Sequence, residues 1–297
     1  MIKEIISKDI PAVKEILQKV LGTTEYSDLQ RMGGLTNHTY KVTLQNGEAY
    51  VVRIPGEGTE ELINRRDEKC STELACRLGI DAPLLYFGED GTKVTRFIHA
   101  ARTMNNCTVG LEENLVRIAN VLHKLHTCGE KTNVIFEVFD MAADYEKIIS
   151  SNHVTLYDDY GQIKERVMEM KAYVDSQGEI MKVPCHNDPL SENWVLDGDE
   201  RMYLIDWEYA GMNDAMWDLA DVSIEAGLTA SQDEILLNAY FDRNPTAQER
   251  SRFHANKIYL DYLWTLWGKA RVPFDGEEME DYALERYNRL KKNLESH

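Results

Sequence analysis

The fold of this 297-residue chain can be traced to residues 185–209, which read CHNDPLSENWVLDGDERMYLIDWEY. His186, Asp188 and Asn193 form the pattern HxDxxxxN, and Asp206 follows thirteen residues later, after an apolar run. The spacing places Asp188 and Asn193 on one loop and Asp206 at the end of a strand that follows a tight turn. Oxygen ligands that converge in this way suit Mg²⁺ with bound phosphates. Phosphoryl transfer needs this arrangement and one carboxylate that receives the acceptor's proton.

The whole pattern resembles the catalytic loop and the metal-binding Asp of the kinase-like fold. His-Asn-Asp at 186–188 and Ile-Asp-Trp-Glu-Tyr at 205–209 are similar to its small-molecule branch of choline/ethanolamine kinases and aminoglycoside phosphotransferases. The resemblance extends over nearly the whole chain. It implies a bilobal, protein-kinase-like α+β fold. Residues 1–98 would form a nucleotide-binding lobe, a small antiparallel sheet with one helix, and residues 99–297 a larger, mostly helical catalytic and substrate-binding lobe.

Hydrophobic periodicity agrees with this division. Apolar residues recur at helical spacing over 9–21, and two β-rich runs flank Asn46-Gly47, the strongest short-range hairpin signal. A helix over about 60–78 and strands at 84–87 and 93–98 complete the expected first lobe. The second lobe should contain helices near 115–125, 161–175, 230–242, 246–271 and 278–294, with a β-rich island at 183–209.

The expected nucleotide site lies in the first lobe. The loop before residue 40 resembles the family's nucleotide-covering loop, which assigns nucleotide contacts to Gly33, Gly34, Thr36 and Asn37. Arg53, in Val-Val-Arg-Ile, occupies the place of the protein-kinase Lys, and its planar guanidinium can grip phosphate oxygens bidentately. By the same similarity, Glu68 should steady Arg53, with Glu73 as the fallback.

The resemblance also assigns roles around the catalytic loop. Asp188 would orient the substrate hydroxyl and accept its proton, while Asn193 and Asp206 would hold Mg²⁺ across the phosphates of ATP. His186 and Asp218 would brace the loop. On the same helix as Leu125, His123 and His126 have no obvious third ligand, so we expect them to cap the helix or to face solvent.

The acceptor pocket should be aromatic. Trp264-x-x-Trp267 and the later Asp-Tyr-Ala-x-x-Arg-Tyr segment resemble two helices that help to build the choline pocket in choline kinases. A quaternary ammonium donates no hydrogen bond, so aromatic faces and nearby carboxylates recognise it. The residues assigned to this pocket are Tyr209, Glu208, Glu225, Trp264, Trp267 and Tyr282.

Composition narrows the partners. Lysine and arginine number 33 against 51 aspartates and glutamates, a formal net charge of −18 that disfavours nucleic acid and anionic lipid as partners. Five scattered cysteines without a CxxC pair predict neither disulfides nor a zinc site. No apolar run approaches a membrane span or the core of a signal peptide, so we expect a cytoplasmic protein without membrane insertion. The oligomeric state is not indicated.

The sequence therefore predicts ATP- and Mg²⁺-dependent phosphorylation of choline to phosphocholine, with ATP and choline as small-molecule substrates. A kinase for ethanolamine or an aminoglycoside is the alternative within the same class. Two other classes stay open. One is a catalytically silent kinase-like binding module. The presence of Asp188, Asn193 and Asp206 together argues against it, because a binding module does not need all three. The other is a metal-dependent hydrolase built on His186, Asp188 and Asp206, which would leave Arg53 without a task.

Overall fold

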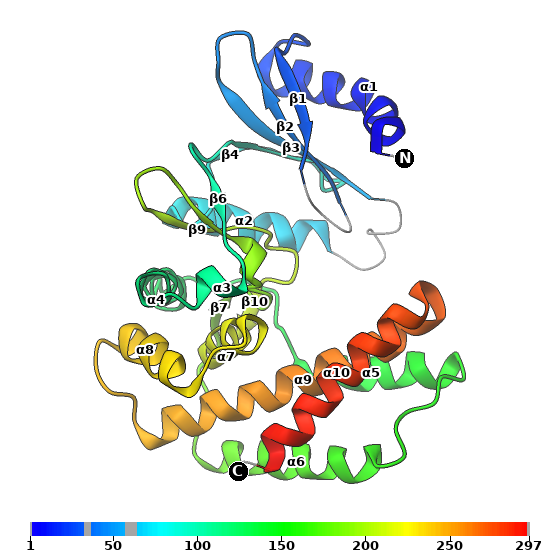
Figure 1. The fold of residues 1–297 in the computed structure, drawn as a ribbon, viewed down its shortest axis with the longest axis vertical. Coiled ribbons are helices and arrows are strands. Elements are labelled where there is room, and N and C mark those ends of the chain that lie inside the picture. Colours follow the sequence, from blue (N-terminus) through cyan, green and yellow to red (C-terminus); the bar gives the residue numbers. More distant parts are fainter. Residues whose placement is uncertain (1, 33–36, 57–63, 296–297) are drawn as a thin grey trace. The chain divides into compact units, whose positions relative to one another are not determined.

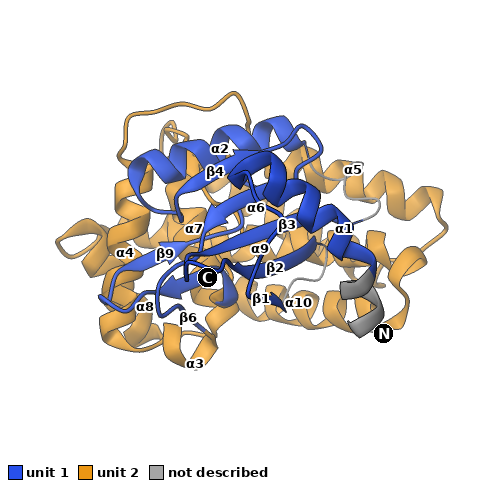
Figure 2. Ribbon diagram, turned by 90° about the horizontal axis from the view of Figure 1, so that it is seen from above, with its two compact units in different colours: residues 1–104, 192–210 blue, residues 105–191, 211–297 orange. Residues whose placement is uncertain are grey.

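The computed structural model describes residues 2–32, 37–56 and 64–295 (Figure 1). The chain forms two compact units, coloured separately in Figure 2. Unit 1 contains residues 1–104 and 192–210, and unit 2 contains residues 105–191 and 211–297. The sequence-based boundary at residue 98 placed residues 192–210 with the C-terminal lobe, and the structure places them in unit 1 instead.

Unit 1 is built on a five-stranded antiparallel sheet among its described residues, in the order β1-β2-β3-β5-β4. Its strands are β1 (Asp28–Arg31), β2 (Asn37–Thr43), β3 (Ala49–Pro55), β4 (Leu84–Phe87) and β5 (Lys93–Arg96). The predicted hairpin joins β2 to β3, and Gly47 in its turn has a φ of 87°, which glycine adopts without a Cβ clash. The edge strand β1 is too short for alternation to reveal it in the sequence.

Two helices belong to this sheet's unit. α1 (Ile2–Leu21) begins earlier than the periodicity over 9–21 indicates, and its Val13 and Leu17 are fully buried in the core under the sheet. The strand residues in that core alternate, because successive side chains of a strand point to opposite faces; they are Tyr40, Val42, Tyr50, Val52 and Val94. α2 (Arg65–Leu78) starts at the Asn64 cap and ends at Gly79, whose φ is 64°.

Residues 192–210 belong to unit 1 because of strand pairing. β6 (Arg102–Thr103) pairs with β8 (Trp194–Leu196), which pairs with β9 (Met202–Leu204). The Leu204 backbone N–H also donates to the Ile80 carbonyl oxygen at 3.1 Å. These hydrogen bonds attach the segment to residues 80–103, a long-range pairing that no local pattern announces.

Unit 2 combines a two-stranded sheet with helices. β7 (Val183–Cys185) pairs with β10 (Gly211–Asn213). Its described helices are α3 (Asn106–Val109), α4 (Glu112–His126), α5 (Val138–Ser151), α6 (Tyr160–Ser176), α7 (Ala215–Ala226), α8 (Ala230–Phe241), α9 (Ala247–Asp275) and α10 (Glu277–Glu295). The long helix α9 packs against α5, α6, α7 and α10, while α8 packs against α4. The sequence pattern does not indicate α5. Within the described part of the chain, no helix is both long and apolar enough to cross a bilayer.

Candidate active site

The loop that carries Asp188 is tied to α7 by Asp218. The two carboxylate oxygens of Asp218 accept hydrogen bonds from the backbone N–H groups of His186 and Asn187, each at 2.8 Å. Asn187 has a φ of 68°, a left-handed conformation that few non-glycine residues adopt. The indole N–H of Trp217 donates to the Asn187 carbonyl oxygen at 3.1 Å, which fixes that peptide. These buried hydrogen bonds hold a strained turn in place and thereby orient Asp188.

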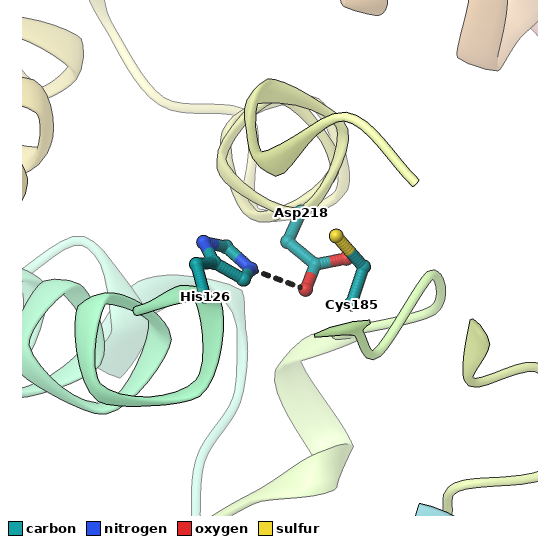
Figure 3. Close-up of side chains that lie close together, drawn as sticks. All are labelled: His126, Cys185 and Asp218. Carbon is teal, nitrogen blue, oxygen red and sulfur yellow. Dashed lines mark hydrogen bonds and ion pairs between the residues drawn. The ribbon is translucent and has the colours of Figure 1, made fainter. Parts of the chain in front are cut away.

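His126 supports the same carboxylate, as Figure 3 shows. Its Nε2 lies 3.0 Å from Asp218 Oδ2, and its Nδ1 lies 2.9 Å from the Tyr240 hydroxyl oxygen. The expectation that His126 caps its helix or faces solvent is wrong, because the residue is buried. Its place four residues after Leu122, on the apolar face of α4, is the sequence signal that could have revealed this position.

His126, Cys185 and Asp218 come close enough to resemble a metal-ligand group. A metal would need the thiolate of Cys185, but burial, with Asp218 and Asp214 nearby, raises the pKa of this thiol well above its usual value. Both ring nitrogens of His126 already have hydrogen-bond partners, as does the Asp218 carboxylate. The three residues therefore act as structural support beside the loop that carries Asp188.

In unit 1, Arg53 on β3 forms the ion pair predicted with Glu68 on α2. Arg53 Nη1 lies 2.5 Å from Glu68 Oε1, and Arg53 Nη2 donates to the Gly91 carbonyl oxygen at 2.8 Å. Arg65 Nη1 lies 2.8 Å from the other oxygen of Glu68. Burial raises the pKa of Glu68, but Arg53, Lys93 and Arg65 outweigh it and hold this pKa below its usual value. Glu68, and not the fallback Glu73, is thus the carboxylate that positions Arg53.

Glu208 lies in the same cationic cluster. Its Oε1 accepts hydrogen bonds from Asn37 Nδ2 at 2.8 Å, Arg65 Nη1 at 2.8 Å and Arg53 Nη1 at 3.3 Å. The resemblance assigned Glu208 to the acceptor pocket, and in the structure its carboxylate contacts Asn37, Arg53 and Arg65. The physical reason is charge: two buried guanidinium groups need more negative charge than Glu68 alone supplies.

The two proposed metal ligands, Asn193 and Asp206, both lie in unit 1. The Ile205 backbone N–H donates to the Asn193 carbonyl oxygen at 2.9 Å, which joins the loop end to the residue before Asp206. Asp206 has a φ of 71°, and its side chain is 45% exposed. A solvent-accessible carboxylate and an amide side chain are oxygen donors of the kind that Mg²⁺ prefers, so the chemistry of this pair fits the ion.

Other predicted residues are divided between the units. Gly33, Gly34 and Thr36 lie outside the described residues. Of the residues assigned to the acceptor pocket, Glu208 and the half-buried Tyr209 lie in unit 1, whereas Glu225, Trp264, Trp267 and Tyr282 lie in unit 2.

The aromatic residues assigned to the acceptor do form one group in unit 2. The rings of Trp264 and Trp267 meet edge to face with centroids 6.0 Å apart, and Trp267 meets Tyr282 in the same way at 5.6 Å. Trp267 and Tyr282 are partly exposed, while Trp264 is 6% exposed. The rings therefore build a surface that combines buried packing with accessible faces.

Glu225 is engaged by two arginines. Both terminal nitrogens of Arg286 contact its carboxylate, the Nη2–Oε2 distance being 2.9 Å, and Arg289 Nη2 lies 3.4 Å from Oε1.

The sequence analysis missed Arg65 and Asp221, which lie close to the predicted residues. Arg65 sits in the first turn of α2, three residues before Glu68, and Asp221 lies three residues after Asp218 on α7. Helical spacing was the signal for both.

Comparison with known proteins identifies the group to which this site belongs. A family model for choline/ethanolamine kinase matches residues 29–284. The chain belongs to the choline/ethanolamine kinase family. Protein LicA of Haemophilus influenzae is 30% identical over 274 residues, which are 89% of this chain and 79% of LicA. This kinase is therefore a phosphotransferase with an alcohol acceptor.

Two solved structures of this kinase family extend the similarity. Choline kinase LicA from Streptococcus pneumoniae is 31% identical with a TM-score of 0.80, and the match covers 96% of this chain and 100% of that one. A structure of LicA in complex with AMP is 32% identical with a TM-score of 0.78, covering 96% and 98%. The protein-kinase-like α+β fold inferred from the sequence is confirmed.

For the kinase variant Asp218→Asn, we expect turnover to fall on the order of 100-fold, because the loop carrying Asp188 loses its anchor. In this variant one of the two backbone N–H groups that now donate to the carboxylate would face the side-chain NH₂ group, itself a donor. The free energy of unfolding should therefore also fall by about 2 kcal/mol or more. Steady-state kinetics and urea unfolding measure both effects. Asp144→Asn, a loss of the same charge at an exposed position, should change stability by less than about 0.5 kcal/mol. Wild-type turnover in Asp218→Asn would refute the anchoring role.

Glu68→Gln should destabilise the kinase by about 3 kcal/mol at neutral pH, because it leaves buried guanidinium charge uncompensated. The folded-state pKa of Glu68 is depressed, so its stabilisation is present above the unfolded pKa and is lost as pH falls through the folded pKa. The stability difference between wild type and Glu68→Gln should therefore shrink below about pH 4. Denaturant unfolding at several pH values tests this, with the exposed Glu89→Gln as control. A difference independent of pH would contradict the ion-pair account.

Proposed function

We propose that this enzyme transfers the γ-phosphoryl group of ATP, with Mg²⁺, to the hydroxyl of choline, giving phosphocholine and ADP. Membership of the choline/ethanolamine kinase family supports the reaction class, and the similarity to the AMP complex of LicA supports an adenine nucleotide. The observation that favours choline as the acceptor is the aromatic group of Trp264, Trp267 and Tyr282 in unit 2.

The chemistry of the acceptor explains this preference. A trimethylammonium group has no N–H, so it gains most from aromatic faces, at ~0.5–2 kcal/mol for each cation–π contact. The primary ammonium of ethanolamine would instead favour hydrogen-bond acceptors around it. An aminoglycoside would favour an extended acidic surface. Edge-to-face aromatic rings therefore support choline over both.

Each residue of the mechanism has a task that follows from its chemistry. Asp188, on the loop fixed by Asp218, accepts the proton of the acceptor hydroxyl and orients its oxygen for attack. Arg53, held by Glu68, contacts phosphate oxygens of the nucleotide. Asp206 and Asn193 would hold Mg²⁺, which supplies charge neutralisation across the phosphates.

We also propose a reducing, cytoplasmic location. The five cysteines are free thiols, which supports a compartment in which disulfides do not form.

The reaction is tested by following ADP release with a coupled assay. MgATP is offered with choline, ethanolamine or kanamycin at equal concentrations, and each reaction is repeated with EDTA. We expect choline to give the highest kcat/KM and EDTA to abolish turnover. Higher kcat/KM with ethanolamine or kanamycin would reject choline as the substrate, and turnover in EDTA would reject the metal requirement.

Asp188→Ala should abolish phosphoryl transfer while leaving the Kd for ATP nearly unchanged, because proton acceptance and hydroxyl orientation act in the transition state. The coupled assay measures turnover, and calorimetric titration measures ATP binding. Near-normal turnover in this variant would remove the catalytic role from Asp188.

Trp264→Ala should raise the KM for choline on the order of 10- to 30-fold, since it removes roughly 1.4–2 kcal/mol of desolvated cation–π contact. The KM for ATP should barely change. Trp264 is largely buried, so the variant also leaves a cavity, and the assay is run at a temperature where it remains folded. Phe253→Ala is the matched control, because Phe253 lies on the same helix and is 5% exposed, outside the aromatic group. Equal effects of both variants on both KM values would mean that Trp264 only packs the core.

A further inference from the structure

Glu225, the carboxylate assigned by the resemblance to the substrate's cation, is already neutralised in this structure. Arg286 binds it with both terminal nitrogens, and Arg289 lies between it and Asp261, with Arg289 Nη2 2.7 Å from Asp261 Oδ1. Two arginines thus face two carboxylates in a closed, charge-balanced cluster. A cation that approached Glu225 would have to compete with these guanidinium groups, so Glu225 offers it little net attraction.

Asp221 differs from every other acidic group described around it. It lies one helical turn before Glu225, is 1% exposed, and neither of its carboxylate oxygens accepts a hydrogen bond from any residue that the structure describes. Burial, with Glu225 and Asp188 nearby, raises its pKa well above the usual value, and Arg286 only partly opposes this. Buried carboxylates normally have hydrogen-bond partners, so an unpartnered one needs an explanation.

Structural carboxylates in the same unit show what a packing role looks like. Asp218 accepts two backbone hydrogen bonds and contacts His126, and Asp261 is bound by Arg289. Asp221 has no such partner among the described residues, although it lies on the same helix as Asp218. Support for the fold therefore does not account for it.

The position of Asp221 relates it to the acceptor. Asp218, Asp221 and Glu225 lie at i, i+3 and i+7, along one face of α7, which runs from the catalytic loop towards the arginine cluster. The charge of Asp221 acts on both Asp188 and the Tyr282 hydroxyl, so it lies near the expected base and near the aromatic group. In choline, only two carbons separate the hydroxyl from the ammonium, and a hydroxyl at Asp188 keeps the ammonium within this neighbourhood.

We propose that Asp221 supplies the negative charge that recognises the substrate's ammonium group, while Glu225 positions Arg286 and Arg289. The proposal rests on the proposed function, because it takes an aminoalcohol as the acceptor. Because the raised pKa favours the protonated carboxyl in the free enzyme, a bound cation stabilises the ionised form and gives Asp221 the partner that the free enzyme lacks. The aromatic rings then select the methyl groups, and Asp221 selects the charge.

The test separates charge from shape. Choline is compared with its neutral carbon isostere, in which a tert-butyl group replaces the trimethylammonium group, and the ratio of their kcat/KM values measures charge recognition. Asp221→Asn removes the charge at nearly constant volume and should lower this ratio at least 10-fold. Its melting temperature should equal or exceed that of the wild type, because an uncompensated buried acid is removed.

Asp233→Asn is the matched control. Asp233 is a largely buried aspartate of unit 2 that is paired with Lys257 at 2.6 Å, outside the aromatic group. Its loss should lower the melting temperature and leave the ratio within about 2-fold of wild type, because paired structural charges affect folding more than recognition. Glu225→Gln is measured in parallel, and the ratio should fall less in it than in Asp221→Asn.

Each remaining outcome counts against the proposal. An unchanged ratio in Asp221→Asn, or a collapse of the ratio only in Glu225→Gln, returns charge recognition to Glu225. A marked loss of folding in both Asp221→Asn and Asp221→Ala shows a structural role. If the wild-type enzyme does not phosphorylate choline, the proposed function itself is rejected. If the wild-type enzyme phosphorylates choline and the ratio is unchanged in Asp221→Asn, only the role of Asp221 is rejected.

Discussion

The structure depends on one constraint: a charge that is buried must be matched by partners. Asp218 meets it with two backbone N–H groups and His126, and it thereby anchors the loop that carries Asp188. The loop's left-handed turn at Asn187 is costly by itself. Because the turn delivers two N–H groups to one carboxylate, the anchor and the strained backbone stabilise each other.

Unit 1 applies the same constraint to cations. Arg53 and Arg65 are buried beside one another, and two carboxylates far apart in the sequence, Glu68 and Glu208, compensate them. Lone guanidinium groups at these positions would be too costly to bury, so the ion pairs fix where the arginines lie. The result is a pair of guanidinium groups held in place before any ligand binds, and a preorganised group loses less entropy on binding.

The sequence could predict those parts of the site that depend on local pattern. The spacing from His186 to Asp206 indicated the fold, Asn46-Gly47 the hairpin, and the position of Arg53 its partner Glu68, which the ion pair confirms. It could not predict the parts set by long-range pairing. The strands of 192–210 find their partner at β6, and Glu225 meets arginines more than sixty residues away. The sequence next to residues 192–210 and Glu225 contains no pattern that indicates these partners, because tertiary packing brings them together.

The acids of α7 show how such packing separates roles that look equivalent in sequence. Asp218, Asp221 and Glu225 share one helical face and one chemistry, yet their partners differ. Backbone N–H groups satisfy the first, and two arginines satisfy the third. The middle one accepts no hydrogen bond from any described residue, and burial raises its pKa well above the usual value. To select a cationic ligand over a neutral one, a protein needs an acidic group that other protein groups have not already neutralised. Only such a group interacts more favourably with the cation than with the neutral ligand. On this helix, the arrangement of arginines, more than the presence of carboxylates, decides where a cation can be recognised.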